Sequence, residues 1–360
     1  MCSFVNYYIQ EPIALAVLTP IQSRGVGYAV ALREVLSLLL RRWKIRYAYI
    51  KMTSNGFQAQ PHLVDSHAHV CDPVFDPDRD DVLERARKVG IAAVVAVGEV
   101  LSDAERNMQL AARHLMIRPA AGLYPTFLNL DLAKGMHEFI RAHKEKLVAI
   151  GEVGLDYWVV KNESDRELQR EIFRGFIGLS KELNLPLNVH SRSAGRHAIA
   201  VLLDSGAARV QLHAFDGKPG AALPAVEAGF FFSIPPSVVR SEQKQKLVKR
   251  LPLSCLLIET DSPVLGPLPQ ERNEPANALV SLKAIAELKN TSKAEVMEAV
   301  AENTRRLYGD LSAAGGCNQT AGPLDNPETF PEEQETALVL HRADRPTTSL
   351  VLSVASVPPW

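Results

Sequence analysis

Two histidines spaced two residues apart occur in a segment that begins apolar and turns polar, LVDSHAHV at residues 63–70. In a β-strand the side chains at positions i and i+2 point to the same face, so His67 and His69 should converge. Asp65 lies on that face too, where its carboxylate can accept a hydrogen bond from an imidazole and orient the ring. Such a pair is more often structural than metal-binding, so other residues must decide its role.

Four more polar side chains follow apolar segments further along the chain. They are Glu152 in LVAIGEVGLDY, His190 in PLNVHSR, His213 in VQLHAFDG and Asp261 in CLLIETDSP. If these segments are parallel strands, their carboxyl ends share one edge and the four side chains meet the histidine pair. Four imidazoles and two carboxylates buried together without a cation would leave polar groups unpaired and like charges close. The set therefore indicates a metal site.

The number of donors favours two metal ions. A single catalytic zinc usually takes three protein ligands, whereas six donors suit two ions roughly 3.5–4 Å apart. We expect Glu152 to bridge them, with His67, His69 and Asp261 on one ion and the remaining two histidines on the other. Imidazole mixed with carboxylate favours zinc, manganese, cobalt or iron, with magnesium as a weaker alternative. Such a pair activates a water for hydrolysis, and Glu152 or Asp261 is positioned to accept its proton.

The elements that must position these residues alternate regularly. Short apolar segments occur at residues 62–70, 91–98, 117–124, 147–155, 186–190, 210–213, 230–234 and 256–259, with amphipathic segments between them. Eight strand–helix pairs predict an α/β fold of the TIM (β/α)8 barrel type, in which functional groups lie at the carboxyl ends of the strands. A doubly wound open sheet also alternates, but no GxGxxG fingerprint is present.

The two ends of the chain differ from the middle in charge. Residues 1–60 carry a net charge of +5 and residues 311–360 a net charge of −4, within a total of −1. We expect an N-terminal extension at 1–60, a metallohydrolase barrel at 61–310 and a disordered tail at 311–360 that is rich in Ser, Thr, Pro and Ala. An arginine-rich helix at about residues 30–43 would suit a mitochondrial targeting segment, although we favour an accessory extension.

Composition excludes several classes of protein. A net charge of −1 provides no global basic field for nucleic acid. The four cysteines lie far apart without a CxxC pattern, which is typical of reduced thiols inside the cell. The longest apolar stretch, residues 27–40, includes Arg33 and Glu34 and is too short to span a membrane. We expect a soluble, monomeric cytoplasmic or nuclear protein with no membrane partner.

The motifs VDSHAH, IGEVGLDY, NVHSR, LHAF, IPPS, ETDSP and RNEP together resemble the TatD family of metal-dependent deoxyribonucleases, and are most similar to its TatD domain-containing protein 3 group. The resemblance covers about residues 62–310. DxHxH alone is shared by many metallohydrolases, but the combination is specific. It implies a TIM barrel that cleaves DNA phosphodiester bonds, as a 3′–5′ exonuclease or at abasic sites, with the six residues above as metal ligands.

The resemblance also implies residues that contact the substrate. Asp156, Arg192 and Arg272, from GLD, HSR and RNEP, are the candidates. One departure affects this set, because Tyr124 in GLYP occupies the place of the histidine in the family's Gly-x-His-Pro motif. Tyrosine can donate a hydrogen bond to a phosphate but cannot carry a positive charge. We therefore expect catalysis with an altered rate or substrate preference.

Two alternatives to a nuclease remain. A small-molecule amidohydrolase or deacylase uses the same metal arrangement, usually with a carbamylated lysine on the fourth strand, where this chain has Glu152. A catalytically impaired nucleic-acid-binding barrel would explain Tyr124, but it would not need all six ligands. The near-zero net charge is compatible with single-stranded or end-bound DNA, since metals and a few local cations suffice to hold the phosphates at one end.

Overall fold

The computed structural model describes residues 63–311, which form eight parallel strands that alternate with helices. The strands pair in chain order and β1 contacts β8. They are β1 Leu63–Ala68, β2 Ile91–Ala96, β3 Ile117–Ala121, β4 Ala149–Gly154, β5 Leu187–His190, β6 Val210–Leu212, β7 Phe231–Ile234 and β8 Leu256–Ile258. The predicted (β/α)8 barrel is confirmed. The helix expected at residues 30–43, the extension at 1–60 and nearly all of the tail lie outside the described residues.

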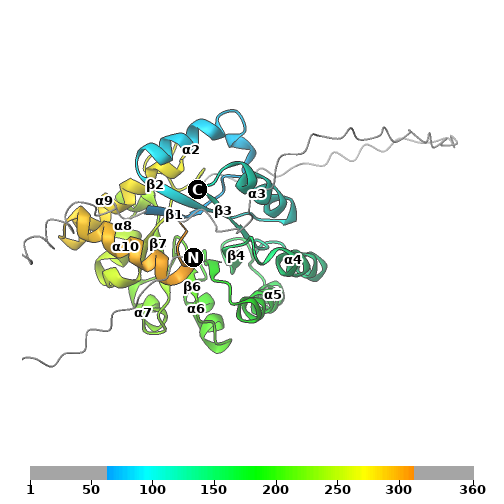
Figure 1. Ribbon diagram of the computed structural model, residues 1–360. Helices are drawn as coiled ribbons and strands as arrows, with labels where there is room; N and C mark the ends of the chain where they lie inside the picture. Colours follow the sequence, from blue (N-terminus) through cyan, green and yellow to red (C-terminus); the bar gives the residue numbers. More distant parts are fainter. Residues whose placement is uncertain (1–62, 312–360) are drawn as a thin grey trace, which may run out of the picture. The chain divides into compact units, whose positions relative to one another are not determined.

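Helices surround the strands in chain order, from α2 in blue to α10 in orange (Figure 1). They are α2 Arg79–Lys88, α3 Leu101–Arg113, α4 Leu130–His143, α5 Glu163–Leu183, α6 Gly195–Asp204, α7 Pro219–Glu227, α8 Glu242–Arg250, α9 Ala278–Lys289 and α10 Lys293–Tyr308. Four short 3-10 helices join them, η1 Pro73–Phe75, η2 Pro236–Val239, η3 Leu253–Cys255 and η4 Pro275–Asn277. None of the helices between residues 63 and 311 combines the length and apolar character that crossing a bilayer requires.

Local sequence explains where several helices begin and end. The side chain of Asn162 accepts a hydrogen bond from the backbone at the start of α5, and Ser292 forms a capping box with Glu295 at the start of α10. Helices α5 and α9 end at Asn184 and Asn290, both in the left-handed conformation that asparagine tolerates. These caps give the helices defined lengths, and so a defined position for the loop at each strand end.

Backbone hydrogen bonds at the carboxyl end of β1 close the barrel. Asp261 N donates to His67 O at 2.9 Å, and His69 N donates to Ser262 O at 2.8 Å. Asp261 has a positive φ of 53°, a conformation that is strained for residues other than glycine and persists where neighbours hold it. The segment after β8 is therefore held directly beside the two histidines of β1.

The barrel has an apolar core and, within it, a cluster of buried polar side chains. Large apolar side chains are fully buried, among them Phe173 and Phe176 of α5 and Phe230 and Phe232 at β7. Strands of a parallel barrel are covered on both faces, which is why β1 is buried at every position.

Five residues form a buried polar cluster within this frame: Ser66, Asn188, Gln211, Ser233 and Tyr308. Asn188 Nδ2 donates to the Ser66 carbonyl at 3.0 Å and to the Tyr308 hydroxyl at 3.2 Å. Tyr308 donates to Gln211 Oε1 at 2.6 Å, and Gln211 donates to Ser66 O and Ser233 Oγ. Because Tyr308 is the last residue of α10, this cluster connects α10 to strands β1, β5, β6 and β7.

Removing one hydroxyl from this cluster should destabilise the fold. Tyr308→Phe leaves Gln211 Oε1 without its buried donor and removes one of the two acceptors of Asn188 Nδ2, and we expect the free energy of unfolding to fall by about 1–3 kcal/mol. Urea denaturation followed by circular dichroism measures the change. The matched control is Tyr157→Phe, whose hydroxyl contacts the partly buried Arg170 guanidinium. Equal, small effects of both variants would contradict a structural role for the cluster.

Candidate metal centre

The histidines of β1 face two carboxylates from other strands. His67 Nε2 and His69 Nε2 lie 3.3 Å apart. Asp261 Oδ1 lies 3.4 Å from the first and 3.6 Å from the second. Glu152 Oε2 approaches the same two nitrogens at 3.8 and 3.3 Å. Four donor atoms from β1, β4 and the end of β8 thus converge.

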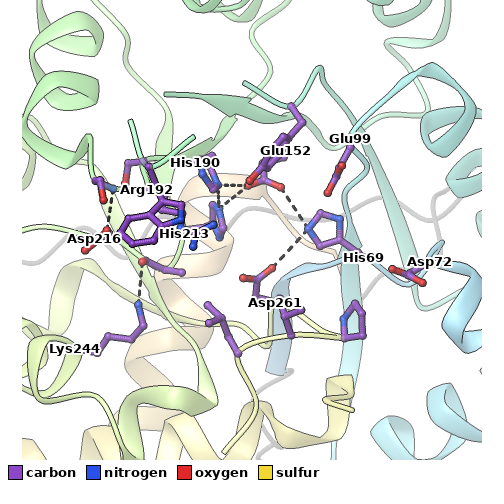
Figure 2. Close-up of a pocket in the computed structure, with 18 residues that line it drawn as sticks. His69, Asp72, Glu99, Glu152, His190, Arg192, His213, Asp216, Lys244 and Asp261 are labelled. Atoms are coloured by element: carbon purple, nitrogen blue, oxygen red, sulfur yellow. Dashed lines mark hydrogen bonds and ion pairs between the residues drawn. The ribbon is translucent and has the colours of Figure 1, made fainter. Parts of the chain in front are cut away.

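The other oxygen of Glu152 faces a second pair of histidines. Its Oε1 lies 2.6 Å from His190 Nδ1 and 2.7 Å from His213 Nε2, and these two nitrogens are 3.2 Å apart. Figure 2 shows the carboxylate between this pair and His69. The structure therefore brings all six predicted ligands together, with Glu152 at the centre.

The donor chemistry fits a metal cation. Ligand atoms within 4.8 Å of one another form three overlapping triads: His67, His69 and Glu152; His67, His213 and Asp261; and Glu152, His190 and His213. All six side chains are buried except that of His69, which is 15% exposed. Borderline metals prefer this mixture of imidazole and carboxylate donors.

The protonation of His67 gives a sharper test of fit. Its Nδ1 lies 2.8 Å from Asn188 Oδ1, and the amide of Asn188 is oriented by its two donations to Ser66 and Tyr308. Asn188 Oδ1 is thus an acceptor, so His67 Nδ1 carries a hydrogen and Nε2 is the ring atom that faces the carboxylates. Burial acts to lower the pKa of this ring, but the Asp261 hydrogen bond and the charge of Glu152 raise it. Nε2 next to two anions favours a positive charge at this position, which a proton or a bound metal ion can supply. The arrangement is the one that a metal-binding histidine adopts.

Both carboxylates in the cluster are held in their anionic form. Burial acts to raise the pKa of Glu152, but the charges of His213 and His190 lower it well below its usual value. For Asp261, burial is likewise outweighed by hydrogen bonds from His67 and His69, which lower the pKa of this carboxyl. Two anions in a nearly dry space attract a cation far more strongly than they would in water.

The pKa values of two of the imidazoles shift in opposite directions. Burial lowers the pKa of His213 to about 4, and the neighbouring charge of His67 adds to the effect. Burial also acts on His190, but the charge of Glu152 and the Asp156 hydrogen bond raise its pKa to about 9. Protons therefore cannot occupy all the ring nitrogens that face the carboxylates, whereas a divalent ion would satisfy several at once.

The supporting contacts correct one expectation from the sequence. Asp65 was expected to orient a histidine ring, but its carboxylate accepts hydrogen bonds from Thr260 N at 2.8 Å, Thr260 Oγ1 at 2.5 Å and the His67 backbone N. It therefore holds β1 and the end of β8 in register. The ring partner of His67 is Asn188, which lies two residues before His190 on the same face of β5. The i and i+2 spacing that identified the first pair could have identified Asn188.

A cavity of about 420 Å³ opens beside the cluster. Five of the six predicted ligands line it, while His67 is fully buried behind them. Tyr124 and Arg192 also line the cavity. The Tyr124 ring lies 4.9 Å from that of His190, and burial together with nearby carboxylates raises the pKa of its hydroxyl, which therefore stays protonated.

The other two predicted substrate residues lie elsewhere. Asp156 is fully buried, with Oδ2 at 3.2 Å from His190 Nε2 and Oδ1 accepting from two backbone amides, so it orients His190 and does not line the cavity. Arg272 forms a two-point ion pair with Asp78 at 2.8 and 2.6 Å and packs over the Phe75 ring. It is not among the residues that line the cavity.

Sequence reasoning missed several residues of the cavity wall. Trp158, Lys244 and Glu99 all line it. Lys244 comes from the amphipathic segment SEQKQKLVKRL, where the pattern does not tell which of the cations faces inward. Trp158 follows Asp156 by two residues, so its place in the loop after β4 was the available signal.

Comparison with known proteins supports the same assignment. The sequence model of the family described as "TatD related DNase" matches residues 64–309. The human deoxyribonuclease TATDN3 is 47% identical over 264 residues, which cover 69% of this chain and 95% of the human protein. The uncharacterized metal-dependent hydrolase YabD of Bacillus subtilis is 35% identical, over 68% of this chain and 98% of its own.

A solved structure agrees with these matches. The TatD homolog YJJV of Escherichia coli superposes with a TM-score of 0.64 at 25% identity, over 69% of this chain and 98% of its own. The matched residues run from the start of β1 to just past the end of α10, so they include every strand and all six clustered side chains. This chain belongs to the TatD related DNase family.

Proposed function

We propose that this chain is a divalent-metal-dependent deoxyribonuclease that hydrolyses phosphodiester bonds of single-stranded or end-bound DNA, by 3′–5′ exonuclease action, at abasic sites, or both. The position of Glu152, with one carboxylate oxygen toward each pair of histidines, carries the proposal. The human relative named a deoxyribonuclease and the bacterial relative named a metal-dependent hydrolase support it. Because one chain supplies all six ligands, the centre needs no second copy, and we expect the enzyme to act as a monomer.

Two divalent ions, magnesium, manganese or zinc, would bind at the cluster. His67, His69 and Asp261 would hold one, His190 and His213 the other, and Glu152 both. When bound, such ions lower the pKa of a water and neutralise charge on a phosphate. Glu152 and Asp261 are the acceptors nearest to that water, and their anionic state suits them to receive or relay its proton.

Residues at the cavity wall would bind and orient the strand. The protonated Tyr124 hydroxyl donates a hydrogen bond to a phosphate oxygen, in place of a charged imidazole. Arg192 offers a forked guanidinium from the rim. Trp158 is 57% exposed beside the cavity, and an unpaired base stacks well on such an indole. These features support a single strand or a frayed end as substrate.

Metal binding should be stoichiometric and stabilising. We expect isothermal titration of chelator-stripped protein with manganese or zinc to give two ions per chain. Free metal at 100 times its Kd should stabilise the fold by about 2.7 kcal/mol, seen as a higher thermal midpoint that chelator reverses. Glu152→Gln should weaken both sites, whereas His143→Gln, on α4, should change neither. Failure to bind any metal would refute the centre itself.

Nuclease activity should depend on the same cluster. We expect wild-type protein to cleave a short 3′-labelled single strand with an added divalent ion, and Glu152→Gln and Asp261→Asn to lower turnover by at least about 100-fold. Glu242→Gln, an exposed carboxylate on α8, is the matched control. Stripped protein is assayed with magnesium, manganese and zinc separately. Absent cleavage with two ions bound would favour the amidohydrolase or deacylase alternative.

Tyr124 should determine rate and substrate choice. Tyr124→Phe removes the proposed hydrogen bond to phosphate and should lower kcat/KM about 10- to 100-fold. Tyr124→His adds a group that can become positively charged and should change the ratio of 3′-end cleavage to abasic-site cleavage. Steady-state kinetics on the two substrates measure both effects, with Tyr157→Phe as control. Unchanged turnover and preference in Tyr124→His would rule out this role.

A further inference from the structure

Lys244 brings a positive charge into the cavity beside the metal centre. It lies in the first turn of α8 and lines the cavity, and its Nζ donates to Ala214 O at 3.0 Å (Figure 2). Among residues 63–311, this ammonium group forms no ion pair with a carboxylate. An ammonium group has three donors, so two more are available to a ligand.

The position of this ammonium group is fixed by its surroundings. Gln243, the preceding residue, donates to Phe215 O at 3.2 Å and Gly217 O at 2.7 Å. Together with the Lys244 bond, these contacts tie α8 to the loop at residues 214–217. That loop begins directly after His213. The lysine is therefore held at a set position relative to the predicted metal ligands.

The electrostatic environment favours an anionic ligand near Lys244. Burial lowers the pKa of its ammonium, while the charges of Glu259 and Asp216 act to raise it. A cation removed from water without a carboxylate in contact is costly, and a bound anion offsets that cost. Arg192 is the other Lys or Arg side chain among the described residues that line the cavity. A phosphate bound at the metal centre would thus face Lys244 on the part of the cavity wall that α8 forms.

We propose that Lys244 binds a phosphate oxygen of the substrate strand at the metal centre. The inference rests on the proposed function, since it names the side chain that contacts the phosphate of a polynucleotide. A lysine acts here as a point charge with rotatable donors, which tolerates the varied orientations of a flexible strand. The alternative is a structural tie between α8 and the loop after β6, which would affect folding but not phosphate affinity.

The test compares three substitutions in metal-loaded, full-length protein. Lys244→Met removes the charge and keeps the aliphatic length, Lys244→Arg keeps the charge, and Lys246→Met is the control on the same helix, where the lysine is exposed and pairs with Glu242. Two quantities are measured: KM and kcat for a short single strand over a range of salt, and the affinity of inorganic phosphate by isothermal titration.

We expect Lys244→Met to raise KM and to weaken phosphate binding by about 10-fold or more, with a smaller effect on kcat. The slope of log KM against log salt should fall by about one unit. Lys244→Arg should restore most of the phosphate affinity, and Lys246→Met should behave as wild type. Thermal midpoints of all variants identify any loss of folding.

The outcomes separate this inference from the proposed function. Wild-type cleavage with unchanged KM and phosphate affinity in Lys244→Met would overturn the role of Lys244 and leave the nuclease standing. Absent cleavage, but phosphate binding that depends on Lys244, would overturn the nuclease and retain the subsite. If Lys244→Arg and Lys244→Met lose phosphate affinity equally, the residue acts as a structural tie and the inference fails.

Discussion

Burial of the Glu152 carboxylate among four imidazoles is the constraint on which the rest of the structure depends. Its two oxygens face two separate pairs of ring nitrogens, three of them within 3.3 Å. Such a cluster is unfavourable in a dry interior unless a cation compensates the charges and the lone pairs. A metal would remove that cost, so residues that would destabilise an ordinary core form a candidate metal site here.

Residues on several strands and on α10 position the side chains of this cluster. Asp65 holds the ends of β1 and β8 together through Thr260, and Asn188 fixes the hydrogen on His67 Nδ1. Behind Asn188, the polar cluster continues to Tyr308 at the end of α10. The last helix of the described residues thus contributes to the orientation of a histidine on the first strand. Buried polar groups of this kind restrict the arrangement because each has a defined partner.

The cavity wall carries charged side chains, although the chain as a whole is almost neutral. The net charge of −1 gives no long-range attraction for DNA, so affinity has to come from the metals and from a few side chains near them. Lys244, Arg192 and Tyr124 line the wall, and Trp158 is exposed beside them. Tyr124 offers a neutral donor where relatives of this fold are expected to have histidine. Under the proposed function, phosphate recognition would therefore shift toward the lysine and arginine.

Much of the fold and of the site could be predicted from the sequence, because both follow from periodicity. Alternating segments predicted eight strands, and polar residues at the strand ends predicted six clustered side chains, which the fold brings together. Contacts between residues far apart in the chain determined the remaining features of the site. The RNEP motif suggested a role at the substrate for Arg272, whose guanidinium forms an ion pair with Asp78 in the folded chain. Asp156 supports His190 and does not line the cavity. The position of a residue on its strand thus determines whether its side chain reaches the carboxyl-terminal end of the barrel. Tertiary packing determines which partner a long side chain contacts and whether it lines the cavity, as Lys244 does.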